Sequence, residues 1–347
     1  MKIEDKKTAT ALALFSGGLD SILACRVILA QGIQVHAVKF VSPFFDYGLL
    51  SREDEYKKEI LDVYGIVVHL VDISSEYIQM IRDPAHGYGK HFNPCVDCKI
   101  FMITKAKEMM AGFGASFLIT GEVIGQRPMS QRCDTLRIIE RDSGCASCGR
   151  GKNQQTAETG GILLRPLCAK NLEPTRPENE GLVDRDLLYN LSGRSRAGQM
   201  ALAKQFGIVD YPTPAGGCIL TDPIKGRRIK NFYARHEYVS VSDMRAITVG
   251  RQFSLPGGGW LVMGRDEAEN TVIEGLAEPE DILLKLAERA GPVALLRRMT
   301  DPKDIQAAAD LVARYGKKGD SGKSEAGSVV CSGREDRILT GVPPIAE

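Results

Sequence analysis

A glycine-rich turn between an apolar run and a helical pattern constrains this chain most. The turn, SGGLDS at residues 16–21, follows the apolar residues 11–14 and precedes a helical pattern at 22–29. Glycines let the backbone approach a ligand, and the first helical turn offers N–H groups and the positive end of the helix dipole. The pattern predicts a phosphate-binding loop, or alternatively only a well-capped helix start. The candidate ligand-binding residues are Ser16, Gly17, Gly18, Asp20 and Ser21, with Asp20 also able to hold magnesium.

Apolar runs and helical stretches alternate through the first part of the chain. Strands are expected at residues 35–41, 66–71, 116–120 and 162–167, and helices at 52–64 and 98–112. This alternation predicts an α/β fold in which a parallel sheet carries helices on both faces. Ligands of such sheets bind beyond the carboxyl ends of the strands, where the unusual loops of this sequence emerge.

The 347 residues suggest two or three domains. The expected division is a domain at 1–223 that carries the phosphate-binding turn and a polar, cysteine-containing insertion at 142–161, a small α+β domain at 224–315 and a mobile tail at 316–347. Within the small domain, short strands are expected at 246–250 and 259–264, and a helix near 279–290.

Composition narrows the class of protein. The formal net charge of +1 gives no global argument for nucleic acid, so any basic surface must be local. No apolar run approaches the roughly 20 residues that span a bilayer, and the N-terminus lacks the features of a secretory signal. Nine cysteines, with two pairs in Cys-x-x-Cys spacing, favour metal, iron–sulfur or thiol chemistry over disulfides. These features predict a cytoplasmic protein without membrane contact.

A second glycine-containing loop, TGEVIGQ, follows the strand expected at 116–120. Gly121 permits close approach of the backbone, Glu122 can bind magnesium, and Gln126 can read a base or a ribose. The alternative for Glu122 is an ordinary loop carboxylate. We therefore add Gly121, Glu122 and Gln126 to the candidate nucleotide site.

Three segments of the sequence resemble segments of one enzyme family. SGGLDS resembles the loop of PP-loop ATP pyrophosphatases, NPCVDC at 93–98 resembles a segment of tRNA 2-thiouridylases, and TGEVIGQ resembles a strand end of 4-thiouridine synthetases. Lys99 departs from the asparagine of the 2-thiouridylase segment. The resemblance implies ATP and Mg²⁺ as cofactors, tRNA as substrate, and adenylation of a uridine oxygen followed by its replacement with sulfur. In that scheme Asp20, Cys98 and Cys218 are the catalytic residues.

The cysteines leave two routes for the sulfur open. A Cys-x-x-Cys at a helix N-terminus is expected to have lowered thiol pKa values. Cys95 and Cys98 form one such pair, and Cys218 is a remote third thiol in the segment PAGGC. Some enzymes of the family hold a [4Fe–4S] cluster with three cysteines, so the resemblance implies Cys95, Cys98 and Cys218 as metal ligands. A persulfide relay needs only Cys98 and Cys218, and the presence of Cys95 favours the cluster.

The remaining cysteines have weaker patterns. Cys145 and Cys148, in the insertion, can form a four-cysteine zinc site with Cys133 and Cys168, although the last two lack partner spacing. A structural pair is the equal alternative. Cys25 lies among apolar residues and is expected in the core, and Cys331 in the tail needs no role.

The C-terminal part has its own resemblance. The segment from Val249 through Asn270 resembles a small RNA-associated domain of ribosome-quality-control proteins, and Gly264, Arg265 and Asn270 match its pattern. Arginines and lysines nearby can bind phosphates, or form a solvated face. The basic residues are Arg227, Arg228, Lys230, Arg251 and Arg265.

The function expected from the sequence is ATP-dependent tRNA uridine thiolation. The alternatives are adenylation of another acceptor in sulfur metabolism, and an RNA- or ribosome-binding factor with a regulatory nucleotide site. The sulfur donor stays open between a cysteine desulfurase, a sulfur carrier and sulfide. The sequence leaves the modified tRNA position and a homodimer open as well.

Overall fold

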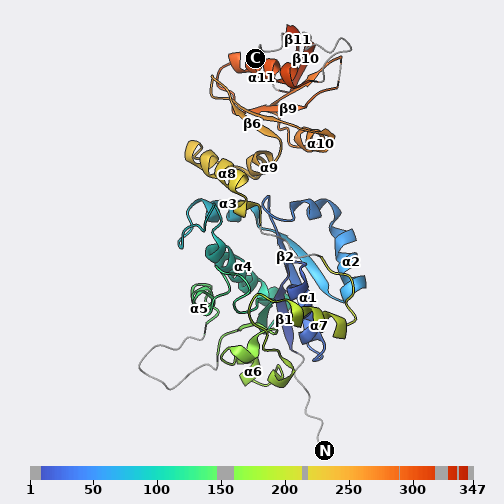
Figure 1. The fold of residues 1–347 in the computed structure, drawn as a ribbon, viewed down its shortest axis with the longest axis vertical. Coiled ribbons are helices and arrows are strands. Elements are labelled where there is room, and N and C mark those ends of the chain that lie inside the picture. Colours follow the sequence, from blue (N-terminus) through green and yellow to red (C-terminus); the bar gives the residue numbers. More distant parts are fainter. Residues whose placement is uncertain are drawn as a thin grey trace, which may run out of the picture. The chain divides into compact units, whose positions relative to one another are not determined.

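A computed structural model describes residues 9–146, 160–212, 218–288, 290–316, 327–333 and 336–342. The chain forms two compact units, which divide between Lys230 and Asn231 (Figure 1). This division lies inside helix α8 (Pro223–Arg235), whereas the sequence suggested a boundary after residue 223. Each unit is described by itself below.

The N-terminal unit contains a five-stranded parallel sheet in the order β3-β2-β1-β4-β5. Its strands are β1 (Thr10–Leu14), β2 (Gln34–Val41), β3 (Val67–Asp72), β4 (Phe117–Thr120) and β5 (Leu163–Leu164). Leu14 at the end of β1 pairs with Thr120 at the end of β4, so the loops that follow these strands emerge side by side. The α/β fold with a parallel sheet is confirmed.

Helices flank this sheet on both sides (Figure 1). They are α1 (Leu19–Leu29), α2 (Glu53–Tyr64), α3 (Ser74–Arg82), α4 (Cys95–Met109), α5 (Cys133–Asp142), α6 (Arg176–Asn179) and α7 (Ala197–Gln205). Short 3-10 helices are η1 (Tyr47–Arg52), η2 (Met110–Phe113), η3 (Ala169–Asn171), η4 (Arg185–Leu187) and η5 (Ile219–Thr221). Helix α1 packs against α7, and α4 packs against α3 and α5. The helix expected from Cys98 begins earlier, at Cys95.

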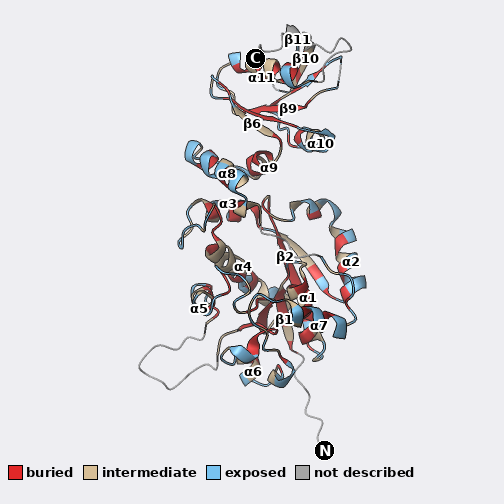
Figure 2. Cartoon of the chain, in the orientation of Figure 1, coloured by how far each residue is buried: buried red, intermediate tan, exposed pale blue. Residues whose placement is uncertain are grey.

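The core of the N-terminal unit surrounds β1 and α1 (Figure 2). Ala11, Leu12 and Ala13 of the central strand are buried because helices cover both faces of a parallel sheet. Cys25 on α1 is also fully buried, as expected for a small apolar side chain in the core. The loop between β1 and α1 therefore starts from the buried core of the unit.

The C-terminal unit contains a six-stranded antiparallel sheet in the order β11-β10-β8-β9-β7-β6. The strands are β6 (Arg251–Ser254), β7 (Trp260–Met263), β8 (Ile282–Leu286), β9 (Ala294–Arg297), β10 (Gly327–Gly333) and β11 (Arg337–Val342). Helices α9 (Val241–Ile247), α10 (Glu267–Glu274) and α11 (Lys303–Tyr315) accompany it. Ile305, Ala308 and Val312 of α11 are buried in the core of this sheet. The unit is an α+β domain, as expected.

Three sequence predictions for this unit were wrong. Residues 246–250 contain the end of α9 rather than a strand, and β8 replaces the helix expected near 279–290. Helical propensity misled there, because alternate residues of β8 are buried and sheet pairing overrides local preference. The region from Gly316, expected to be a mobile tail, supplies β10 and β11, and buries Cys331.

Candidate functional site

The SGGLDS turn connects β1 to α1 as the sequence predicted. Gly17 has a positive φ of 82°, a conformation that glycine adopts readily, and Gly18 is the extended N-cap of α1. The Ser16 hydroxyl oxygen accepts from the Gly18 N–H at 3.3 Å and donates to Ser21 Oγ at 3.2 Å. Ser21 in turn donates to the Gly18 carbonyl at 2.8 Å and is buried. Ser21 therefore holds the turn in shape, while Ser16 is exposed.

A buried lysine that the sequence reasoning missed holds the turn from β2. Lys39 Nζ donates to the Ser16 carbonyl at 2.6 Å and to Asp46 Oδ2 at 2.7 Å. Its side chain is only 4% exposed, so the charge is satisfied by these partners rather than by water. The available signal was a lysine inside an otherwise apolar strand.

Asp20 lies on the first turn of α1, where two other segments meet it. Gln126 donates from Nε2 to Asp20 Oδ2 at 2.9 Å, and Arg196 donates from Nη2 to Oδ1 at 3.3 Å. The buried Gln199 donates to Gln126 Oε1 at 3.1 Å and orients that amide. The structure thus brings Asp20 and Gln126 together as predicted. It adds Arg196 and Gln199 from a segment that the sequence reasoning did not consider.

Gly121 allows β4 to end against the first turn of α1. A Cβ atom at Gly121 would lie 2.4 Å from the carbonyl carbon and oxygen of Asp20 and 2.6 Å from the Ser21 nitrogen. No real Cβ atom tolerates such distances. The structure therefore gives Gly121 a packing role that sets where Asp20 lies.

Glu122 is buried and paired, which does not fit the predicted magnesium ligand. Its Oε2 accepts from Arg165 Nε at 3.0 Å and from the Thr120 hydroxyl at 3.2 Å. Its Oε1 lies 3.6 Å from Lys99 Nζ and is shielded from solvent without a hydrogen-bond partner. Burial acts to raise the pKa of Glu122, but Lys99 and Arg165 outweigh it and the net pKa is lowered. Glu122 is a buried carboxylate that orders the strand end.

The three candidate thiols gather around one tyrosine. The buried Tyr77 hydroxyl donates to Cys98 Sγ at 3.1 Å, and the pKa of Tyr77 is raised by burial and by the nearby Cys98, Cys218 and Cys95. Asn93 donates from Nδ2 to Cys95 Sγ at 3.2 Å. Cys95 and Cys98 at the start of α4 thus share a site with Cys218, although 120 residues separate Cys98 from Cys218.

The expected lowering of the thiol pKa values was wrong for two of these cysteines. Burial raises the pKa of Cys98 to about 11, and it also raises the pKa of Cys218. The hydrogen bond from Tyr77 and the charge of Lys99 oppose this rise at Cys98 but do not cancel it. Desolvation of the thiolate therefore outweighs the helix N-terminus at this site.

The donor chemistry, but not a complete metal geometry, fits an iron–sulfur cluster. Cys95, Cys98 and Cys218 supply three sulfur ligands of the kind that clusters require. Within the described ranges, no three histidine, cysteine, aspartate or glutamate side chains are arranged to hold a metal ion.

The four-cysteine zinc alternative gains no support from the described residues. Cys133 is exposed, whereas the buried Cys168 donates to the Glu122 carbonyl at 3.2 Å. The buried Cys145 lies 3.9 Å from the Ser143 carbonyl. Cys148 lies outside the described residues.

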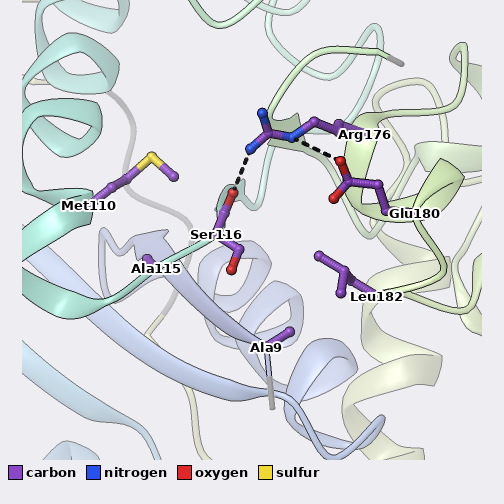
Figure 3. Close-up of a pocket in the computed structure, with 7 residues that line it drawn as sticks. All are labelled: Ala9, Met110, Ala115, Ser116, Arg176, Glu180 and Leu182. Carbon is purple, nitrogen blue, oxygen red and sulfur yellow. Dashed lines mark hydrogen bonds and ion pairs between the residues drawn. The ribbon is translucent and has the colours of Figure 1, made fainter. Parts of the chain in front are cut away.

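A separate pocket lies away from the candidate site (Figure 3). It is bordered by residues next to the starts of β1 and β4, including Ala9 and Ser116, so it opens at the opposite edge of the sheet. Arg176 donates to the Ser116 carbonyl at 3.2 Å beside it. No residue of the predicted site lines this pocket.

In the C-terminal unit, the matched residues Gly264 and Asn270 have structural roles. Asn270 Oδ1 accepts from the Val293 N–H at 2.9 Å and would lie 2.1 Å from a Cβ atom at Gly264. Arg265 pairs with Glu269 at 3.0 Å and is exposed, and Arg251 lies 4.9 Å from the ring centre of Tyr315. Gly264 and Asn270 therefore shape the turn that displays Arg265.

Two family models match separate parts of the chain. Residues 7–146 match the family described as thiamine biosynthesis protein (ThiI), and residues 250–344 match the NFACT protein RNA binding domain. Within the parts of the chain that the structure describes, no helix is long and apolar enough to cross a membrane.

Curated relatives are named as tRNA-thiolating enzymes. The chain is 30% identical to the tRNA-specific 2-thiouridylase MnmA of Syntrophotalea carbinolica over 158 residues, which cover 43% of this chain and 41% of that protein. A protein of the same name from Streptococcus sanguinis is 21% identical, covering 88% of this chain and 83% of the relative. This chain therefore spans about two fifths of the first relative and most of the second.

Among solved structures, a 4-thiouridine synthetase in complex with RNA and bound ATP is similar, with a TM-score of 0.37 and 21% identity. It covers 58% of this chain, which spans 41% of that one. Together with the parallel sheet and the SGGLDS turn, the family matches confirm the resemblance stated from the sequence. The chain carries a ThiI-type PP-loop domain in its N-terminal unit and a domain of the NFACT RNA-binding family in its C-terminal unit.

Proposed function

We propose that this protein is an ATP-dependent tRNA sulfurtransferase that adenylates a uridine oxygen and replaces it with sulfur. The support is the match to the ThiI family together with the two kinds of chemistry that the N-terminal unit brings together. One is the phosphate-binding turn at the start of α1, and the other is the thiol group at the start of α4.

The observation that carries the proposal is that turn and thiols flank one short loop. Gly121 packs against Asp20 on one side of it, and Glu122 lies 3.6 Å from Lys99, the neighbour of Cys98, on the other. A base adenylated beside Asp20 would thus be activated close to the sulfur of Cys98. A protein that only binds RNA needs neither feature.

In the first step, the uridine oxygen attacks the α-phosphorus of ATP and the bond to pyrophosphate breaks. The N–H groups of the SGGLDS turn and the dipole of α1 stabilise the charge that develops on the leaving pyrophosphate. Magnesium, when bound, would neutralise more of that charge. Asp20, whose side chain is 25% exposed, is the carboxylate that would hold it, since Glu122 is buried.

In the second step, the terminal sulfur of a Cys98 persulfide attacks the activated carbon and AMP leaves. The Cys218 thiolate then attacks Cys98 Sγ, which breaks the S–S bond to the product, leaves a Cys98–Cys218 disulfide and places sulfur on the base. A dithiol reductant restores both thiols, and a cysteine desulfurase or a sulfur carrier that itself bears a persulfide then transfers its outer sulfur to Cys98. Sulfide renews the persulfide only by attacking Cys98 Sγ in the Cys98–Cys218 disulfide, which releases the Cys218 thiol. Cys218 contributes to the raised pKa of Cys98, which supports this pairing.

The same thiols support the second route. Cys95, Cys98 and Cys218 would hold a [4Fe–4S] cluster, which supplies an open iron for a bound sulfide. The hydrogen bond from Asn93 to Cys95 is of the kind that tunes cluster sulfurs. Cys95 has no task in the persulfide route, so its place in the thiol group favours the cluster.

We propose further that the C-terminal unit binds the tRNA. The match of residues 250–344 to the NFACT RNA binding domain supports this, as does the exposed Arg265 in the turn that Asn270 shapes. Phosphate contacts by such side chains give affinity without reading sequence.

Reconstitution with the purified full-length protein tests the function. Unmodified tRNA and ATP with magnesium are supplied with a dithiol and, in separate reactions, with sulfide or with cysteine and a cysteine desulfurase. AMP, pyrophosphate and the tRNA nucleosides are quantified. We expect one AMP and one pyrophosphate for each thiolated uridine. AMP formation without tRNA thiolation would favour another acceptor, and binding of tRNA and ATP without AMP formation would favour a regulatory nucleotide site.

A further inference from the structure

A third segment reaches the nucleotide site, and it is held there from two directions. Ser192 forms a parallel bridge with Ile124, and the Gly193 N–H donates to the Ile124 carbonyl at 2.7 Å. Arg196 follows as the N-cap of α7, a helix that packs against α1. The segment is therefore fixed to both the β4 loop and the helix that carries Asp20.

The guanidinium of Arg196 is only partly satisfied. Its Nη2 donates a hydrogen bond to Asp20 Oδ1 at 3.3 Å. Its Nε is shielded from solvent and has no hydrogen-bond partner within the described ranges. The side chain is 23% exposed, so an incoming ligand can still reach its outer edge. A buried N–H group without an acceptor raises the free energy of the folded protein. A phosphate group offers pairs of oxygens that a guanidinium can bind with two hydrogen bonds.

Positioning of Asp20 does not require Arg196. Gln126 already donates to Asp20 at the shorter distance of 2.9 Å, and Gln199 fixes Gln126 from behind. The arginine thus adds positive charge rather than orientation to the mouth of the SGGLDS turn. Positive charge beside a helix N-terminus favours an anion.

We propose that Arg196 is a further binding residue of the nucleotide site and contacts the β- or γ-phosphate of ATP, the part that leaves as pyrophosphate. This inference rests on the proposed function. Arg196 meets the first turn of α1, whose N–H groups face the phosphates, so its guanidinium lies on the phosphate side of the site.

The test compares ligand affinities by titration calorimetry of the full-length protein. ATP, AMP and inorganic pyrophosphate are the probes, and Arg196→Ala, Arg196→Lys and Arg194→Ala are the variants. Arg194 is exposed on the same segment and controls for a general loss of charge. We expect Arg196→Ala to weaken ATP and pyrophosphate by about 10- to 100-fold, the range of a charge-assisted hydrogen bond. AMP affinity should change less than about 2-fold, Arg196→Lys should recover part of the loss, and Arg194→Ala should match the wild type.

Equal weakening of AMP and ATP, or unchanged pyrophosphate affinity in Arg196→Ala, would overturn the inference. Combining Arg196→Ala with Asp20→Asn distinguishes a phosphate contact from a role in which Arg196 only positions Asp20. If Arg196 acts only through Asp20, Arg196→Ala adds nothing there, whereas a phosphate contact still weakens pyrophosphate. A wild-type protein that fails to bind ATP would instead count against the proposed function.

Discussion

The close packing of Gly121 against the first turn of α1 allows a quantitative prediction. A Cβ atom there would lie 2.4 Å from the Asp20 backbone, whereas ordinary contacts begin at 3.4 Å. Gly121→Ala must therefore move the start of α1 or the end of β4 by about 1 Å, a shift that packed secondary structure resists. Overpacking of this kind costs about 1–3 kcal/mol of stability. A 1 Å misplacement of a reacting group lowers the rate about 100-fold.

The assays are urea unfolding followed by circular dichroism and pyrophosphate release at saturating ATP. We expect Gly121→Ala to lower the free energy of unfolding by about 1–3 kcal/mol and the rate by at least about 10-fold. Gly112→Ala is the matched control, since a Cβ atom there meets nothing within 4 Å. Gly121→Ala with wild-type stability and rate would refute the conclusion that this glycine fixes the position of Asp20.

Three further predictions concern the candidate site and the C-terminal unit. Asp20→Asn should abolish pyrophosphate release without loss of the fold, because Asp20 is a partly exposed carboxylate on the first turn of α1. Turnover at the wild-type rate would show that Asp20 is not part of the active site. Anaerobically purified protein should contain about four iron ions per chain. The iron should be lost in Cys98→Ala but retained in Cys145→Ala, and loss only in Cys145→Ala would place the cluster elsewhere. An active protein without iron would favour the persulfide route. Deletion of residues 231–347 should weaken tRNA binding and flatten its salt dependence while ATP affinity stays unchanged; equal tRNA affinity would refute the RNA role.

The sequence predicted the strands and the helices α1, α2 and α4 of the N-terminal unit because its signals there are local. The SGGLDS turn and the apolar strands specify β1 and α1 without help from distant residues. Asp20 and Gln126 were assigned to one site because the loops after β1 and β4 of a parallel sheet must meet.

What the sequence did not predict depends on contacts across the chain. Arg196 reaches Asp20 through a segment 176 residues away, and no local pattern marks it. The pKa of Cys98 was misjudged because the helix N-terminus is visible in the sequence, whereas burial of the thiol is not. The burial of Glu122 and its ion pair with Arg165 were not predicted for the same reason, since Arg165 lies on the far side of the insertion.

The same limit explains the errors in the C-terminal unit. The leucines and Lys285 within 282–286 favour a helix by propensity, but pairing of β8 with β9 and β10 selects a strand. The strands β10 and β11 gave little signal because their pairing partners stabilise them more than their own composition does.

Nucleoside mass spectrometry of tRNA from cells that lack the gene tests the central claim most directly. The account predicts that one thiolated uridine disappears from the tRNA. The wild-type gene should restore it, whereas genes that carry Asp20→Asn or Cys98→Ser should not, because the first lacks the adenylation site and the second lacks the sulfur-carrying thiol. Unchanged thiolated nucleosides in the deletion strain, or full restoration by both variants, would contradict the proposed sulfurtransferase function.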